Sequence, residues 1–166
     1  MTDVLLHGEC KPQATPSERF AMMTSAAGAR VLGIQTAQLA AVMEWSCGHM
    51  GVQSISLAGV GPVSSVLTLC AASLSDTSID HITLTDSLAS LKQLTEEIMR
   101  YDDYPSLFCF GLLQSFDIRE LLALLAPVPI KVNQPHADHH RLIEEWSPLT
   151  ELYDRLGSVD FKPWQV

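Results

Sequence analysis

The sequence predicts an α/β fold with a mainly parallel sheet of about four strands, in a two-layer or three-layer arrangement. Short β-rich segments alternate along the chain with segments of helical periodicity, which is the pattern of strand-helix-strand units. The predicted strand at residues 54–57 is followed by a turn that contains two glycines and then by an apolar helix. Hydrophobic residues make up 47% of the chain and the mean hydropathy is +0.17. A sheet buried on both faces, or a subunit interface, would remove this apolar surface from water.

The first 29 residues are predicted to form an N-terminal arm, and residues 30–166 one domain. A chain of 166 residues is long enough for a single core. The arm carries prolines and glycines among polar residues, and a short helix is predicted at 16–25 with Pro16 in its first turn. The domain opens with a predicted helix at 33–47, ended by Gly48. The apolar positions at helical spacing in this helix are Ile34, Ala37, Ala41 and Trp45.

The middle of the chain is predicted to alternate strongly between strands and helices. After the strand at 54–57 come a helix at 62–74, a strand at 81–85 and a helix at 87–100 with leucines at helical spacing. Residues 101–111 are predicted to be a loop. Asp117 is a plausible N-cap with Glu120 three residues later, which is a capping box for a helix through Leu125.

The last part of the chain predicts a third strand, a long helix and a short fourth strand. The third strand is expected at 128–132, where a proline at the beginning is tolerated. A loop at 133–138 leads into a helix from about 139 to 156, interrupted near Pro148 and stopped by Gly157. The fourth β-like stretch is 161–166.

Charge and composition exclude several classes of partner. The net charge is −9 with 10 lysines and arginines, and no basic cluster is present, so neither a nucleic-acid nor an anionic-membrane partner is expected. No stretch of about 20 apolar residues occurs, and the first residues do not resemble a secretory signal. The four cysteines form no C-x-x-C pair, which favours reduced thiols. We therefore expect a cytoplasmic protein without a cofactor.

Five stretches together carry a resemblance to a known family. They are Leu32-Gly33, residues 54–72 around the turn Gly59-Val60-Gly61-Pro62-Val63, residues 85–90, residues 117–127 and residues 152–157. In order and spacing, residues 30–166 resemble the carboxyl-terminal half of α/β-hydrolases of the acetyl xylan esterase and dienelactone hydrolase kind. The resemblance implies half of an α/β-hydrolase fold, with esterase activity as the family's function.

The sequence departs from that family at the catalytic positions. A nucleophile motif G-x-S-x-G would need serine at position 61 and glycine at 63, and the chain has Gly61 and Val63. The resemblance places an acid in the loop after the third strand, where Asp138 stands, and the histidine beyond Val166. It thus implies that an ordinary Ser-His-Asp mechanism is absent, and it raises the possibility that the chain is a fragment.

A non-standard hydrolytic site is predicted at the carboxyl ends of the strands. Ser87 follows a strand and could act as nucleophile, with His140 (or His136 or His139) as base and Asp138 orienting the histidine. The alternative is that Asp86 or Ser87 only caps the following helix. The backbone at Gly59 and Gly61 could bind an oxyanion, or the two glycines could simply permit a tight turn.

The segment 136–140 is also a weak candidate for a metal site. His136, Asp138 and His140 are ligand types that suit zinc, if a helix begins early enough to place the two histidines on one face. The alternative is a solvated helix start with an acid near the positive end of the dipole.

Two functions are compatible with these features. The first is a carboxylic ester hydrolase acting on a small ester substrate through Ser87. The second is a catalytically inactive, hydrolase-derived domain that associates with itself or with a protein partner. If the four strands follow the second half of the hydrolase fold, they lie in chain order, and right-handed crossovers place the helices on one face and leave the other face and the first strand's edge open. A parallel sheet cannot leave an apolar face in water, so we expect the N-terminal arm, a second copy in a homodimer, or a partner chain to cover the open face.

Overall fold

The computed structural model describes residues 2–97, 99–136 and 139–157, apart from the side chains of His139 and His140. Three parallel strands, β1 (Ile55–Val60), β2 (Ile79–Thr85) and β3 (Ile130–Asn133), form a sheet in the order β1-β2-β3. The helical elements are η1 (Gly8–Cys10), α1 (Ser17–Ala26), α2 (Val31–Met50), α3 (Pro62–Leu74), α4 (Gln93–Glu96), α5 (Leu112–Ser115), α6 (Ile118–Leu124) and α7 (His139–Arg155). The α/β fold with a parallel sheet is confirmed. The predicted fourth strand at 161–166 lies outside the described residues.

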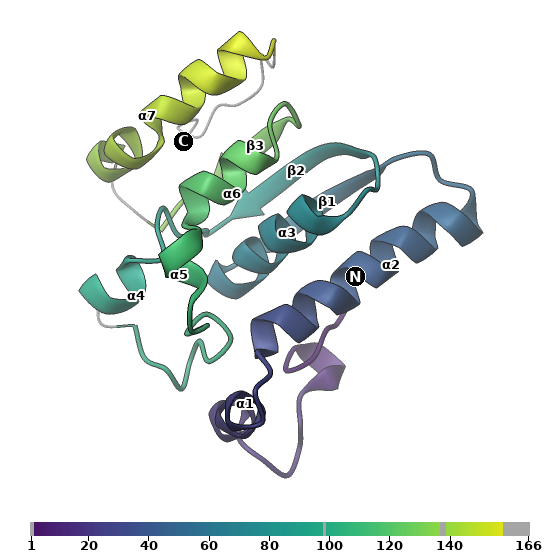
Figure 1. The fold of residues 1–166 in the computed structure, drawn as a ribbon, viewed down its shortest axis with the longest axis vertical. Coiled ribbons are helices and arrows are strands. Elements are labelled where there is room, and N and C mark those ends of the chain that lie inside the picture. Colours follow the sequence, from purple (N-terminus) through teal and green to yellow (C-terminus); the bar gives the residue numbers. More distant parts are fainter. Residues whose placement is uncertain (1, 98, 137–138, 158–166) are drawn as a thin grey trace.

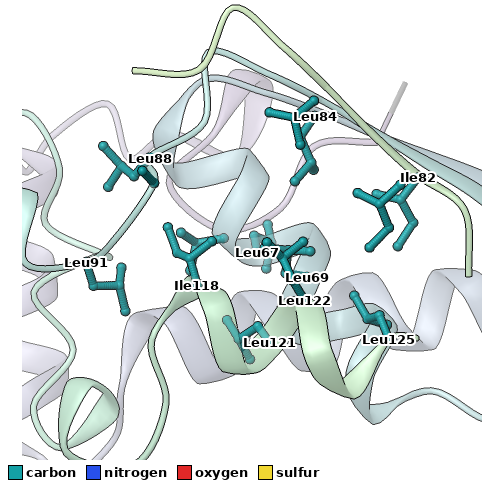
Figure 2. Close-up of a cluster of buried hydrophobic side chains, with 14 of the residues drawn as sticks. Leu67, Leu69, Ile82, Leu84, Leu88, Leu91, Ile118, Leu121, Leu122 and Leu125 are labelled. Atoms are coloured by element: carbon teal, nitrogen blue, oxygen red, sulfur yellow. The ribbon is translucent and has the colours of Figure 1, made fainter. Parts of the chain in front are cut away.

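The helices form a layer on one face of the sheet. In Figure 1, α3 and α6 lie over the strands, with α2 beside α3 and α7 beside α6. The main core lies between this layer and the sheet, where Ile82 and Leu84 of β2 pair in register with Ile130 and Val132 of β3. Figure 2 shows these β2 side chains facing a group of leucines and isoleucines from α3, α6 and the segment after β2.

The opposite face of the sheet is not covered by the described helices. Its side chains are exposed or half-buried, and the register places them in three rows: Ser56 with His81; Ala58 with Thr83 and Lys131; Val60 with Thr85 and Asn133. Most of them are polar or small, so the expectation of an apolar open face was wrong. A parallel strand pair can face water here because alternate positions of β2 and β3 carry threonine, lysine and asparagine instead of Val or Ile.

The apolar stripe of α2 faces outward. Ile34, Ala37, Ala41 and Trp45, the positions at helical spacing, are exposed, and Trp45 is 53% exposed. The helix instead buries Leu32, Gln35 and Met43 toward α3 and the arm. Both sides of this helix are apolar, so periodicity alone did not determine which side is buried.

Other boundaries also differ from the prediction. The helix α2 continues through Gly48 to Met50, and Gly51 follows it with a φ of 66°, the left-handed conformation of a glycine C-cap. Pro148 lies inside α7 without ending it. The helix predicted at 87–100 is wrong: within the described part of that segment only α4 is helical.

The N-terminal arm packs against the domain through a few apolar contacts. Val4 joins the main core, while Leu6, Ala21 and Val31 form a small second cluster between the arm, α1 and the start of α2. None of the helices within the described residues combines the length and apolar character needed to cross a membrane.

Candidate functional site

The turn between β1 and α3 is built around two glycines with different roles. Gly61 adopts φ 86° and precedes α3, and its N–H donates to the carbonyl of Thr85 at 2.8 Å. Because Pro62 has no N–H and the N–H of Gly61 is already bonded within the sheet, neither can serve an oxyanion here. Gly59 is buried, and α3 passes close to it. These contacts favour the tight-turn interpretation of Gly59 and Gly61.

Substituting Gly59 tests how closely α3 approaches β1. A Cβ at Gly59 would lie 2.9 Å from both the Ser64 carbonyl oxygen and the Ser65 Cα, which are backbone atoms that cannot rotate away. We expect Gly59→Ala to lower the free energy of unfolding by about 1–3 kcal/mol. Gly48→Ala is the matched control, because a Cβ there meets nothing within 4 Å. Urea unfolding followed by circular dichroism measures both, and equal stability of the two variants would contradict the close approach.

Ser87 is buried just after β2. The residue is 1% exposed and its hydroxyl has no hydrogen-bond partner among the described residues, while its carbonyl accepts the N–H of His136 at 2.7 Å. No helix begins at Asp86 or Ser87, so the capping interpretation was wrong; Asp86 instead takes a positive φ of 55°. The preceding strand thus ends in a loop that directs Ser87 inward.

Three side chains hold the loop at 86–92: Gln93, which follows it directly, and Asp117 and Trp146, which come from distant segments. The Gln93 carboxamide oxygen accepts the N–H groups of Ala89 and Ser90, and its nitrogen donates to Glu97 and to the carbonyl of His136. Asp117, the N-cap of α6, accepts from Ser90 and Leu91, and the Trp146 indole donates to the Ala89 carbonyl at 3.0 Å. These bonds satisfy the loop backbone without a helix. The capping box between Asp117 and Glu120 is confirmed.

His136 lies at the surface between two carboxylates. Its Nδ1 is 3.6 Å from an Asp86 oxygen, its Nε2 is 3.5 Å from a Glu97 oxygen, and its side chain is 49% exposed. Arg141 bonds Glu96 at 2.7 Å and Glu97 at 3.4 Å on the same surface. The two ring nitrogens of His136 face different carboxylates at distances longer than a hydrogen bond, whereas Arg141 hydrogen-bonds both glutamates. Among the described residues, no group of three histidine, cysteine or acidic side chains is placed to hold a metal.

The structure places the predicted site residues only in part. Ser87 and His136 are joined through their backbones, but the Ser87 side chain is buried and that of His136 is half exposed. Asp138 lies outside the described residues and the side chain of His140 is not described, so the predicted catalytic set of Ser87, Asp138 and His140 stays a prediction, as does the metal set. Gln93 and Glu97 were not predicted as site residues. A helix at 87–100 gave no reason to expect their contacts with His136, which lies about 40 residues further along the chain.

A groove runs beside β1 at the edge of the sheet. Its volume is about 750 Å³, and it is bounded by arm residues 2–4 and 7–8, by Leu39 of α2, and by residues of β1 and α3. The strand β1 pairs with β2 alone among the described strands, so its other edge has no strand partner there.

No family model matches the chain, and the comparisons with curated proteins and with solved structures found no match either.

Proposed function

We propose that this chain is a non-catalytic α/β module that binds an extended segment of a partner protein along the free edge of β1. The observation that carries the proposal is that one edge of β1 has no strand partner among the described residues and opens into the groove of about 750 Å³. Adding a strand to an exposed sheet edge is a common mode of peptide recognition, in which backbone hydrogen bonds supply affinity. Descent from half of an α/β-hydrolase, which the sequence resemblance implies, remains part of this proposal.

The backbone of β1 supplies the required donors and acceptors. The N–H groups of Ile55 and Gly61 donate to Ser78 and Thr85, so odd-numbered residues of this strand bond toward β2. The N–H and C=O groups of Ser56, Ala58 and Val60 therefore point to the other edge. No backbone hydrogen bond joins them to another described residue. The strand has neither the charges nor the prolines that commonly protect an edge.

The walls of the groove favour a segment with alternating apolar side chains. Val4, Leu39 and Leu67 line it on the side of the arm and the helices. In an added strand every second side chain would face these apolar walls, and the others would lie on the open face beside Ser56 and Ala58. This alternation defines the chemistry of the expected partner segment.

A selected peptide tests the proposal directly. Random linear peptides of eight to ten residues would be selected by display on the intact chain, and the best binder measured by fluorescence anisotropy. We expect Ala58→Pro, which removes an outward N–H, to weaken binding by about tenfold or more, whereas the control Ala58→Ser, which keeps the N–H, binds normally. N-methylating alternate residues of the peptide should have the same effect on the unmodified protein.

Three results would overturn the assignment. One is a failure to select any binder, and another is binding that neither Ala58→Pro nor N-methylation weakens. The third is a dimer by light scattering that Ala58→Pro converts to a monomer, because the occupant would then be a second copy.

An ester assay in the same study addresses the alternative, a hydrolase. We expect no turnover of p-nitrophenyl acetate by the wild type or by Ser87→Ala, since the Ser87 hydroxyl is buried and has no base among the described residues. Removing an unpaired buried hydroxyl should leave stability unchanged or raise it by about 1 kcal/mol. Turnover that Ser87→Ala abolishes while the fold stays intact would restore the hydrolase assignment.

A further inference from the structure

A second cavity lies away from the β1 groove, beside the loop that precedes α5. Its volume is about 250 Å³ and, apart from Thr95 and Cys109, its walls are leucine and phenylalanine: Leu91, Leu94, Leu107, Phe108, Phe110, Leu112 and Leu113. It shares no lining residue with the groove beside β1. We propose that this cavity binds an anionic amphiphile, an unbranched alkyl carboxylate whose chain enters the cavity and whose head group pairs with Arg30.

The cavity has a buried floor and an exposed apolar rim. Leu91, Leu94 and Leu107 are at most 8% exposed and form its interior. At the rim, Phe110 is 80% exposed and Leu113 is 46% exposed. Large apolar side chains gathered around a cavity are typical of a binding site. A volume of about 250 Å³ suits a single alkyl chain better than the surface of a folded protein.

Arg30 supplies a positive charge beside this rim. Its guanidinium carbon is 5.7 Å from the centre of the Phe110 ring, and Nη1 donates to the neighbouring Ala29 carbonyl. Five other basic side chains form ion pairs with carboxylates: Lys92, Arg100, Arg119, Arg141 and Arg155. Arg30 forms no such ion pair with another described residue. A carboxylate head group would give it the bidentate partner that a guanidinium favours.

The positive charge of Arg30 also affects the pKa of Cys109, a residue of the cavity wall. Burial raises the pKa of the Cys109 thiol, and the nearby positive charge of Arg30 opposes that rise. The apolar cavity and the positive charge of Arg30 over the Phe110 ring at its rim favour an anionic amphiphile over a neutral or cationic one.

Titration calorimetry with matched eight-carbon probes tests the proposal. We expect octanoate to bind saturably with one site per chain, and binding to tighten by about fourfold for each methylene from hexanoate to octanoate. Octan-1-ol should bind about tenfold more weakly, and octyltrimethylammonium more weakly still. No saturable octanoate binding, or octan-1-ol binding as tightly as octanoate, would overturn the proposal.

Variants separate the roles of the head group and the chain. Arg30→Gln should weaken octanoate binding about tenfold and leave octan-1-ol unaffected, whereas Phe110→Ala should weaken both. Phe110 is largely exposed, so its substitution should preserve the fold. Arg155→Gln, at an exposed ion pair on α7, is the matched control and should bind both probes normally. Equal octanoate affinity of Arg30→Gln and Arg155→Gln would contradict the head-group assignment.

Thiol alkylation locates the ligand. Octanoate should slow the alkylation of Cys109, which lines the cavity, but not that of Cys47 on α2, which is similarly half-buried. Peptide mass mapping after N-ethylmaleimide treatment measures each thiol separately. Equal protection of both cysteines would indicate non-specific adsorption and reject this site. Ala58→Pro should bind octanoate normally, so a failure of the β1 proposal is distinguishable from a failure of this one.

Discussion

Trp146→Ala is expected to lower the free energy of unfolding by about 3–5 kcal/mol, as large-to-small substitutions of buried aromatic residues do. Trp146 on α7 is fully buried in the main core, and its indole nitrogen donates to the Ala89 carbonyl at 3.0 Å. The substitution would leave a cavity between α7 and the loop after β2, and would also leave that carbonyl without this donor. Urea unfolding followed by circular dichroism gives the change in free energy.

Two further variants show how much of that loss comes from the hydrogen bond and how much from burial of the ring. Trp146→Phe keeps most of the buried area but loses the hydrogen bond, so we expect an intermediate loss of about 1–3 kcal/mol. Trp45→Ala, on the exposed side of α2, should change stability by less than about 1 kcal/mol, since Trp45 is 53% exposed. A Trp146→Ala loss no larger than that of Trp45→Ala would contradict the placement of α7 on the core.

Asp117→Ala is expected to lower the free energy of unfolding by about 2–4 kcal/mol, more than the loss of a helix cap alone. Asp117 accepts the Ile118 N–H at 2.7 Å as N-cap of α6, and it also accepts the Leu91 N–H at 2.6 Å and the Ser90 hydroxyl. The substitution therefore removes bonds that hold the loop after β2 as well as the start of the helix.

Comparison with a second carboxylate and with a conservative variant separates these contributions. Asp76→Ala, in an exposed turn, should lie within about 0.5 kcal/mol of the wild type. Asp117→Asn keeps one acceptor oxygen and should recover part of the loss. Amide hydrogen exchange gives a second readout, because Leu91 should exchange faster in Asp117→Ala if the side chain holds the loop. Unchanged exchange at Leu91 would contradict that role.

Features encoded by near neighbours were predicted from the sequence. The span of α3 matches the prediction from its apolar run and from Pro62 at its first turn, and the capping box depends on residues three apart. The parallel pairing of the strands is expected from alternating strands and helices, whereas the order β1-β2-β3 is the one that the resemblance to an α/β-hydrolase half implies. These signals require no knowledge of distant contacts.

The candidate site was less predictable because its contacts span long stretches of sequence. Leu88, Leu91 and Leu94 recur at helical spacing, yet the first two lie in a loop whose backbone is bonded by Gln93, Asp117 and Trp146. Leucines in such a loop reach the core as well as leucines on a helix do. The acid-histidine contacts of His136 depend on that loop and therefore could not be predicted locally.

The sequence by itself determined the α/β class, the chain positions of most helices and strands, and the absence of serine at position 61. The tertiary structure decided which side of α2 is buried, where the segment after β2 leaves helical conformation, and that the open sheet face carries mainly polar side chains. The physical reason for this division is that hydrophobic periodicity indicates only which residues can be buried. Which of them are buried depends on side-chain hydrogen bonds and helix contacts between residues far apart in the chain.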